Sequence, residues 1–107
     1  IKNNVKRNIS NLKRSGKKII GYGSPAKATT ALNFFGVSEE HRYTEYREML
    51  DKERPDFVDV CSWHQQHAEM VIAAAARQPK AILCQKPMAS DLGQADQMLM
   101  AGKRNFV

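Results

Sequence analysis

The stretch DFVDVCSWHQQHAEMVIAAA, residues 56–75, places an apolar run, a polar turn and a helical pattern in direct succession. Residues 57–61, FVDVC, have the length of a buried strand. From Gln65 to Gln78 the apolar side chains recur at helical spacing, and Pro79 ends the pattern. The side chains expected to face the core are those of Ala68, Val71, Ile72 and Ala75. A strand followed directly by a helix is typical of a parallel α/β sheet.

The same alternation of strands and helices extends in both directions along the chain. Strands are predicted at 17–22, KKIIGY, and at 81–84, AILC, while Arg42 and Tyr43 form at most a short stub. The segment 37–43 is polar, so we expect the second strand to be shortened or missing. The predicted fold class is therefore α/β, a three-layer Rossmann-like parallel sheet of three to four strands with helices on both faces.

Two helices are expected around the last two strands. Thr44 caps the first of them and Pro55 ends it, and its inward face carries Tyr46, Met49 and Leu50. Ser90 is expected to cap the last helix, whose apolar face is predicted to carry Leu92, Ala95 and Leu99.

The chain has 107 residues and is 42% hydrophobic, which suits one domain spanning residues 1–107. No apolar run reaches the roughly 18 residues of a membrane span, and the basic N-terminus lacks the apolar segment of a secretory signal. Cys61 and Cys84 show no metal-binding spacing, so they are interpreted as two buried thiols in a reduced, cytoplasmic setting.

Positive charge is concentrated at the N-terminus. Residues 1–38 contain eight Lys and Arg and no acid, whereas residues 39–107 contain nine basic and 11 acidic residues. Residues 1–15 read as a helix ended by Ser15 and Gly16, with an apolar stripe of Ile1, Val5, Ile9 and Leu12. Its cations could contact nucleic acid or an acidic membrane. A solvated face is favoured instead, because the stripe needs covering by the sheet and no nucleic-acid motif is present.

Residues 43–107 resemble the NAD(P)-binding Rossmann domain of the Gfo/Idh/MocA oxidoreductase family. The residues that carry the resemblance are YREMLDKERPDFVDVC at 46–61, HAEMVIAAA at 67–75 and AILCQKPMASDLGQA at 81–95. The resemblance implies a domain that binds NAD or NADP and is followed by a larger substrate domain.

Residues 5–37 are similar to a different family. VKRNISNLKRSGKKIIGYGSPAKATTALNFFGV looks like the C-terminal Rossmann-like domain of sugar C-methyltransferases, in which the methyl donor binds elsewhere. The charge balance also changes near residues 37–43. We therefore expect a chimera, natural or designed, with a methyltransferase-like part at 1–37 and an oxidoreductase-like part at 43–107.

The glycine-rich turn GYGSPAK, residues 21–27, matches the G-x-G-x-x-G/A spacing of a dinucleotide-binding turn. A pyrophosphate would bind the N–H groups at the start of a helix that runs from Pro25 to about Phe35, before Gly36. The candidate cofactor-binding residues here are Gly21, Gly23, Ser24, Ala26 and Lys27. The alternative is a turn that only joins a strand to a helix.

The acidic residue that would hold the adenosine ribose is not in place. Glu39, Glu40 and Glu45 lie close to the expected position, but no apolar strand precedes them. Arg42 could meet a 2′-phosphate, although a solvated arginine is the favoured interpretation.

Gln85-Lys86-Pro87 follows the last strand, where the family has Glu-Lys-Pro. The resemblance implies that the lysine lies near nicotinamide and substrate, so Lys86 is the candidate catalytic residue and a cofactor contact. Gln85 departs from the family by losing a negative charge. The alternative is an inherited loop whose lysine faces water.

Ser62-Trp63-His64 follows the strand at 57–61, at the sheet edge where α/β proteins bind ligands. Trp63 could cover a cofactor ring, although packing in the core is the more usual role of a lone Trp. His67 matches the family's His before the helix and is interpreted as capping or bracing the helix start, and with Trp63 it is counted among the candidate cofactor-binding residues. Two histidines are too few for a metal site, so no metal is expected.

Three functions remain open from sequence: a module that binds a nucleotide weakly, a chain that keeps only the fold, and an oxidoreductase fragment that needs a partner domain. The favoured one is a chimeric or truncated Rossmann-like domain without turnover, with at most weak NAD(P) binding at the glycine turn. The alternative is an oxidoreductase fragment that acts on sugars or polyols and lacks its partner domain. Turnover by the fragment alone is not expected, because Lys86 alone offers no complete acid–base pair. Uncovered sheet edges also predict a homodimer.

Overall fold

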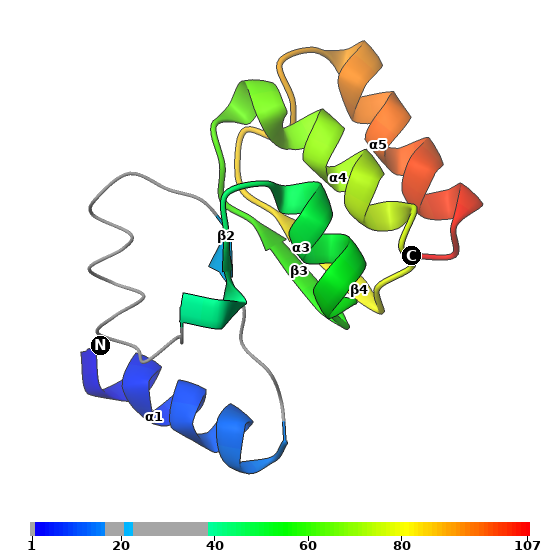
Figure 1. Ribbon diagram of the computed structural model, residues 1–107. Coiled ribbons are helices and arrows are strands. Elements are labelled where there is room, and N and C mark those ends of the chain that lie inside the picture. Colours follow the sequence, from blue (N-terminus) through cyan, green and yellow to red (C-terminus); the bar gives the residue numbers. More distant parts are fainter. Residues whose placement is uncertain (1, 17–20, 23–38) are drawn as a thin grey trace. The chain divides into compact units, whose positions relative to one another are not determined.

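Strands and helices alternate along residues 2–16, 21–22 and 39–107, the part of the chain that the computed structural model describes (Figure 1). The chain divides into two units, residues 1–49 and residues 50–107. Every helix in these ranges is too short or too polar to cross a membrane.

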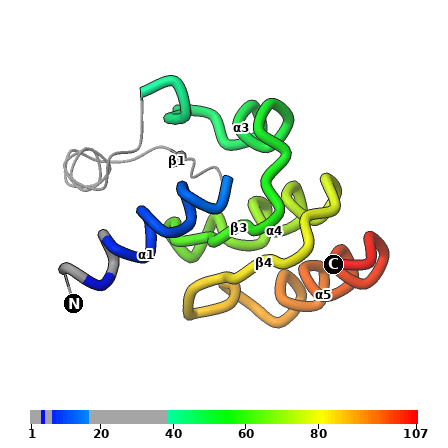
Figure 2. The backbone as a smooth tube through the Cα atoms, turned by 90° about the horizontal axis from the view of Figure 1, so that it is seen from below, coloured from blue at the N-terminus to red at the C-terminus, as the bar shows by residue number. Residues whose placement is uncertain are grey.

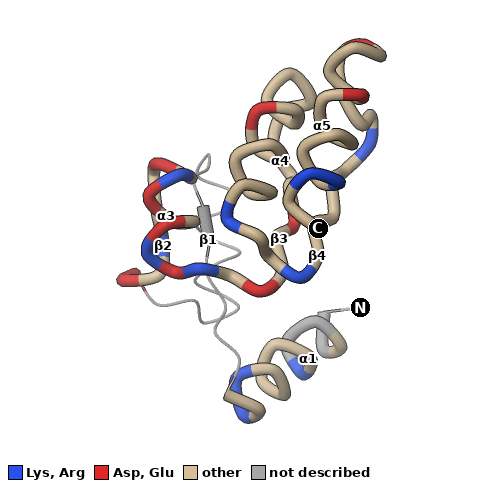
Figure 3. The backbone as a smooth tube through the Cα atoms, turned by 90° about the vertical axis from the view of Figure 1, so that its right-hand side faces the viewer, with Lys and Arg blue, Asp and Glu red and all other residues tan. Residues whose placement is uncertain are grey.

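Helix α1, Lys2–Arg14, begins the N-terminal unit. It ends as predicted at Ser15 and Gly16: Gly16 has a φ of +77°, and its N–H donates to the carbonyl oxygen of Lys13 at 3.1 Å. Glycine adopts this left-handed conformation at a helix C-terminus without strain. The charged side chains of α1 are all basic (Figure 3), and Leu12 is 47% exposed.

The parallel pair β1 and β2 also belongs to this unit. Strand β1, Gly21–Tyr22, pairs with β2, Arg42–Tyr43, so that Gly21 lies opposite Arg42. A one-turn helix, Glu39–His41, precedes β2. A shortened second strand is therefore confirmed. The rest of the strand predicted at 17–22 and the helix predicted over 25–35 lie outside the described residues.

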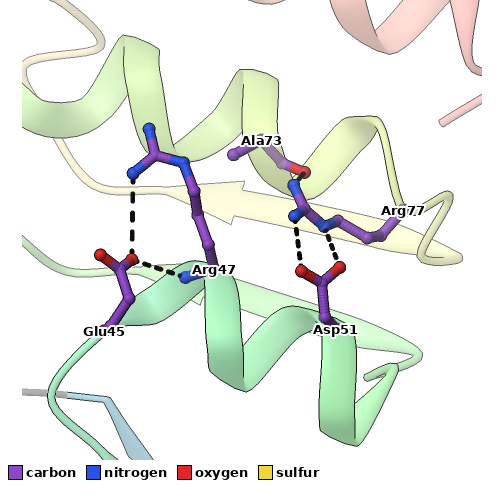
Figure 4. Close-up of polar contacts among 5 residues, drawn as sticks. All are labelled: Glu45, Arg47, Asp51, Ala73 and Arg77. Atoms are coloured by element: carbon purple, nitrogen blue, oxygen red, sulfur yellow. Dashed lines mark hydrogen bonds and ion pairs between the residues drawn. The ribbon is translucent and has the colours of Figure 1, made fainter.

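Helix α3, Tyr46–Glu53, follows β2 and buries the predicted face. Tyr46, Met49 and Leu50 are 8%, 9% and 2% exposed. At the N-terminus of α3, a carboxylate oxygen of Glu45 accepts the Arg47 N–H at 2.9 Å (Figure 4). At its other end Arg54 adopts a left-handed φ of 46° directly before Pro55, which ends the helix as expected.

The C-terminal unit is built on the parallel pair β3, Phe57–Val60, and β4, Ala81–Cys84. Side chains alternate along both strands between an exposed face and a buried or half-buried face. Helix α4, His67–Ala75, contacts both strands, and Figure 2 shows α4 and the two strands running together. Ala68, Val71 and Ala75 are buried as predicted, and Ile72 is half-buried.

Helix α4 is shorter than the predicted span of 65–78. Its first residues form a one-turn 3-10 helix, His64–Gln66, and its last turn unwinds after Ala75. Gln78 then takes a left-handed φ of 55° before Pro79, since the residue before a proline avoids the helical region.

Helix α5, Leu92–Arg104, shows the main departure from the prediction. Its cap is Asp91, whose carboxylate accepts the Gln94 N–H at 2.8 Å, and not Ser90. Leu92 and Leu99 are 85% and 63% exposed, whereas Met98 is 3% exposed. The expected apolar face was wrong for Leu92 and Leu99, whereas Ala95 is half-buried. Helix α5 packs against the alanine-rich helix α4, and its buried Met98 lies on a face with small residues that allow the two helices to approach closely.

A bidentate ion pair joins α3 to the end of α4 in the C-terminal unit. Figure 4 shows Arg77 between Asp51 and Ala73: Nε and Nη2 donate to the two carboxylate oxygens of Asp51 at 2.8 and 3.0 Å, and Nη1 donates to the Ala73 carbonyl at 2.9 Å. Arg77 thereby ties two helices at a fixed geometry.

The packing of α5 is tested by two adjacent truncations. Met98→Ala empties a buried position and should lower the free energy of unfolding by about 2–4 kcal/mol. Leu99→Ala truncates an exposed side chain and should change it by less than about 0.5 kcal/mol. Urea denaturation followed by circular dichroism measures both, and equal losses would contradict the helix orientation.

The ion pair of Asp51 makes stability depend on pH. The hydrogen bond from Arg77, helped by the nearby positive charges, holds the pKa of Asp51 below its ordinary value. A lowered folded-state pKa stabilises the fold above the unfolded-state pKa, and this contribution is lost as pH falls through the folded-state pKa. We expect Asp51→Asn to lower Tm by a few degrees at neutral pH, with the difference from wild type shrinking below about pH 4.

The control for this experiment is Asp56→Asn, which removes an exposed pair with Lys80 whose side chain is 78% accessible. It should change Tm less than Asp51→Asn does, because an exposed single contact is screened by water. A difference between Asp51→Asn and wild type that stays constant from pH 7 to pH 3 would show that Arg77 does not hold the carboxylate.

Candidate functional site

The two strands of the C-terminal unit end at the same edge. Val60 lies opposite Cys84, and the Gln85 N–H donates to the Val60 carbonyl at 3.0 Å, which extends the parallel ladder by one residue. The turn that carries Trp63 and the turn that carries Lys86 therefore leave the sheet at its carboxyl edge. In open α/β sheets this is the edge where ligands bind.

Lys86 and Gln85 are both exposed at this edge, which fits a lysine that reaches a ligand as well as one that faces water. The following peptide bond, Lys86–Pro87, is cis. The catalytic role assigned to Lys86 stays a prediction.

Trp63 is 68% exposed, so its interpretation as a core residue is wrong. It has an extended backbone conformation in the turn directly before the 3-10 helix His64–Gln66, where the chain passes outside the packed layers. Its ring lies 5.6 Å from that of His64, centroid to centroid, at an angle of 36°. An exposed indole on a ligand-binding edge is able to stack on a planar ring.

His67 lies beneath this edge as the first residue of α4, and it is 1% exposed. Its Nδ1 is 2.9 Å from the Pro87 carbonyl oxygen and its Nε2 is 3.0 Å from the Ser62 carbonyl oxygen. The bracing role is confirmed. The capping role is not, because the N-cap residue is Gln66 and its side chain makes no cap bond.

Ser62 contributes a polar atom to which the sequence assigned no role. Its buried Oγ has no hydrogen-bond partner within the described ranges. A buried hydroxyl without a hydrogen-bond partner is energetically costly, so Ser62 is an unsatisfied polar group in the turn that carries Trp63. The exposed groups at this edge are the ring of Trp63 and the cation of Lys86.

The two cysteines are free, but the prediction of two buried thiols is wrong: Cys61 is exposed and Cys84 is half-buried. Cys61 directly follows β3, and Cys84 is the last residue of β4. Partial desolvation, followed by a hydrogen bond with Asp59 and by its negative charge, raises the pKa of Cys61. Desolvation and Asp59 also raise the pKa of Cys84.

The second predicted site, the glycine turn, is described only at its start. Gly21 lies in β1, while Gly23, Ser24, Ala26 and Lys27 lie outside the described residues. Arg42 is half-buried in β2 opposite Gly21, rather than fully solvated. The strand register therefore brings Arg42 next to the beginning of the turn.

No cluster of three or more His, Cys, Asp and Glu side chains with metal-binding geometry occurs among residues 2–16, 21–22 and 39–107. The chemistry of the edge is thus that of a cation, an indole and hydrogen-bonding groups.

Comparison with known families identifies the fold. The model of the Gfo/Idh/MocA oxidoreductase family, with its NAD-binding Rossmann fold, matches residues 5–106. The chain belongs to this family. The Rossmann-like α/β fold class is therefore confirmed, with the parallel pairs β1–β2 and β3–β4 as its described strands.

The named relatives are longer proteins, and this chain matches only a part of each of them. A myo-inositol 2-dehydrogenase of Thermotoga maritima is 34% identical over 65 residues, which are 61% of this chain and 19% of that protein. The structure of a myo-inositol 2-dehydrogenase from Lactobacillus plantarum superposes with a TM-score of 0.71 at 28% identity, covering 84% of this chain and 26% of the enzyme.

A levoglucosan dehydrogenase in complex with NADH and levoglucosan superposes with a TM-score of 0.67 at 28% identity. The match covers 84% of this chain and 24% of that one. The present chain thus spans about a quarter or less of these Gfo/Idh/MocA relatives.

The Gfo/Idh/MocA match begins at residue 5 and continues through the stretch 5–37 that resembles sugar C-methyltransferases. A methyltransferase part and a chimeric chain find no support in these comparisons. The one family model covers both stretches.

The environment of Cys61 is tested by its alkylation rate. Thiolates and not thiols react with iodoacetamide, so the raised pKa should make exposed Cys61 react more slowly than free cysteine at pH 8. In a Cys84→Ser background, Asp59→Asn removes the main negative neighbour and should raise the rate about threefold to tenfold. Asp56→Asn is the matched control. An unchanged rate in Asp59→Asn would exclude the coupling.

Proposed function

We propose that this chain is the NAD(H)-binding part of an oxidoreductase that transfers hydride between a nicotinamide cofactor and a polyol or sugar. The family match supports the cofactor class. The names of two relatives, an inositol dehydrogenase and a levoglucosan dehydrogenase with bound NADH, support the substrate class.

The observation that carries the proposal is the position of Lys86. It is exposed at the carboxyl end of β4, beside the turn that holds Trp63, where the family resemblance implies a lysine near nicotinamide and substrate. A lysine in this position can hydrogen-bond a substrate hydroxyl and stabilise the charge that develops on its oxygen during hydride transfer.

In the C-terminal unit, the exposed ring of Trp63 would cover a base of the cofactor. The G-x-G-x-x-G/A spacing of residues 21–27 supports a turn that binds pyrophosphate. When bound, the nicotinamide supplies the hydride acceptor or donor. Arg42 lies opposite Gly21, and a guanidinium matches a 2′-phosphate, so NADP is the alternative cofactor.

A second candidate is a nucleotide-binding module without turnover. Gln85 favours it, because an amide replaces the carboxylate that the family resemblance implies beside the lysine. Turnover would then require residues beyond the part that this chain shares with its longer relatives. The homodimer expected from open sheet edges stays a prediction.

The proposal is tested by titrating the chain with NADH and NADPH while following the fluorescence of Trp63, the single tryptophan. We expect saturable energy transfer from Trp63 to the bound dinucleotide. Lys86→Ala should weaken the affinity about threefold to tenfold, because it removes one charge at the edge.

The matched control is Lys80→Ala, since Lys80 is an exposed lysine beside the opposite end of β4. It should leave the affinity unchanged. Absence of any saturable signal up to millimolar dinucleotide would overturn the proposed function, and equal weakening by the two variants would remove the assigned role of Lys86 in binding.

A further inference from the structure

His67 is the single buried polar or charged residue in the described part of the chain, and it is also the largest side chain that is fully buried there. A buried imidazole is stable only when its nitrogens are satisfied by hydrogen bonds. Its partners therefore indicate what the residue does.

Both ring nitrogens of His67 lie at hydrogen-bond distance from backbone carbonyl oxygens, and a carbonyl oxygen can only accept. The ring donates to both oxygens when both nitrogens carry a proton, and to one of them when it carries a single proton. At 2.9 and 3.0 Å both contacts have the length of ordinary N–H···O bonds.

The two carbonyls belong to different turns. Ser62 lies five residues before His67 in the turn that carries Trp63, and Pro87 lies 20 residues after it, directly behind Lys86. Besides the ladder bond between Gln85 and Val60, the His67 side chain thus has a hydrogen-bond partner in each turn. The hydrogen-bond ladder between β3 and β4 ends where the two turns begin. A contact beyond the ladder is therefore needed to hold the turns at a fixed position relative to each other.

We propose that His67 is a positioning residue that clamps the Ser62–Trp63 turn to the Lys86–Pro87 turn, so that order gained in one turn is transmitted to the other. The clamp fixes the distance between the indole and the lysine across the carboxyl edge. Because His67 is itself buried, it acts through these turns and not by touching a ligand.

The clamp is measured by amide hydrogen exchange on the whole chain without ligand. The reporters are the Gln66 amide, bonded to the Trp63 carbonyl at 2.8 Å, and the Gln85 amide, bonded to the Val60 carbonyl at 3.0 Å. In His67→Phe, which has no donor, exchange at both amides should rise about tenfold more than at the Asn105 amide of α5. His67→Asn keeps one donor and should show a smaller rise.

Met98→Ala is the matched control, because it destabilises the same unit from α5 without touching either turn. After correction for the loss of global stability, the exchange rates of the Gln66 and Gln85 amides should rise no more than the rate of the Asn105 amide. If His67→Phe or His67→Asn gives the same pattern as Met98→Ala, His67 only fills space and the clamp is overturned. Where His67→Phe fails to fold, His67→Asn alone decides.

Transmission to a ligand rests on the proposed function, and it is tested separately. Saturating NADH should slow exchange at both Gln66 and Gln85 in the wild type, and at only one of the two in His67→Asn. If NADH does not bind the wild type, the proposed function fails while the exchange test without ligand still decides the clamp. If NADH slows both amides equally in His67→Asn and in the wild type, the transmission is overturned.

Discussion

The packing of α4 onto β3, β4 and α5 is the contact on which the C-terminal unit depends. Seven of the nine residues of α4 are buried, and four of the seven are alanines. A two-stranded sheet is marginally stable by itself in water, so its half-buried face needs this helix. Small side chains let α4 approach α5 closely, and the helix is therefore covered from more than one side.

The same helix positions the candidate site because its first residue is His67. The apolar part of α4 fixes where the helix begins, and that start lies under the carboxyl edge of β3 and β4. The core and the site are thus joined by a single element. A change that shifts α4 along the sheet would also change the spacing between Trp63 and Lys86, even if neither turn were altered.

Electrostatics around the C-terminal unit act at two different places. Arg77 joins Asp51 at the far end of α4, where it adds geometric order between helices. Asp59 acts near the strand ends, where it adds to partial burial in raising the pKa of the Cys61 thiol. Neither interaction involves Lys86, whose exposed cation stays available for a ligand.

The amino-acid sequence by itself determined the order of the elements and their type. Period-two and period-3.6 patterns are local, and so the strands at 57–61 and 81–84, the buried face of α3 and the short second strand could all be predicted. The family resemblance of residues 43–107 likewise rests on local motifs. The methyltransferase resemblance of 5–37 finds no support in the comparisons, and a short glycine-turn motif is shared by many Rossmann-like families.

Only the tertiary structure decided which face of α5 is buried, that Trp63 is exposed and that His67 joins two turns. Several faces of α5 carry apolar side chains, and the contact with α4 selects the one whose small residues allow close approach. The partners of His67 are backbone carbonyls, which every residue possesses, so no pattern of side chains could reveal them. Such choices depend on long-range packing, and packing is not a property of any local stretch of sequence.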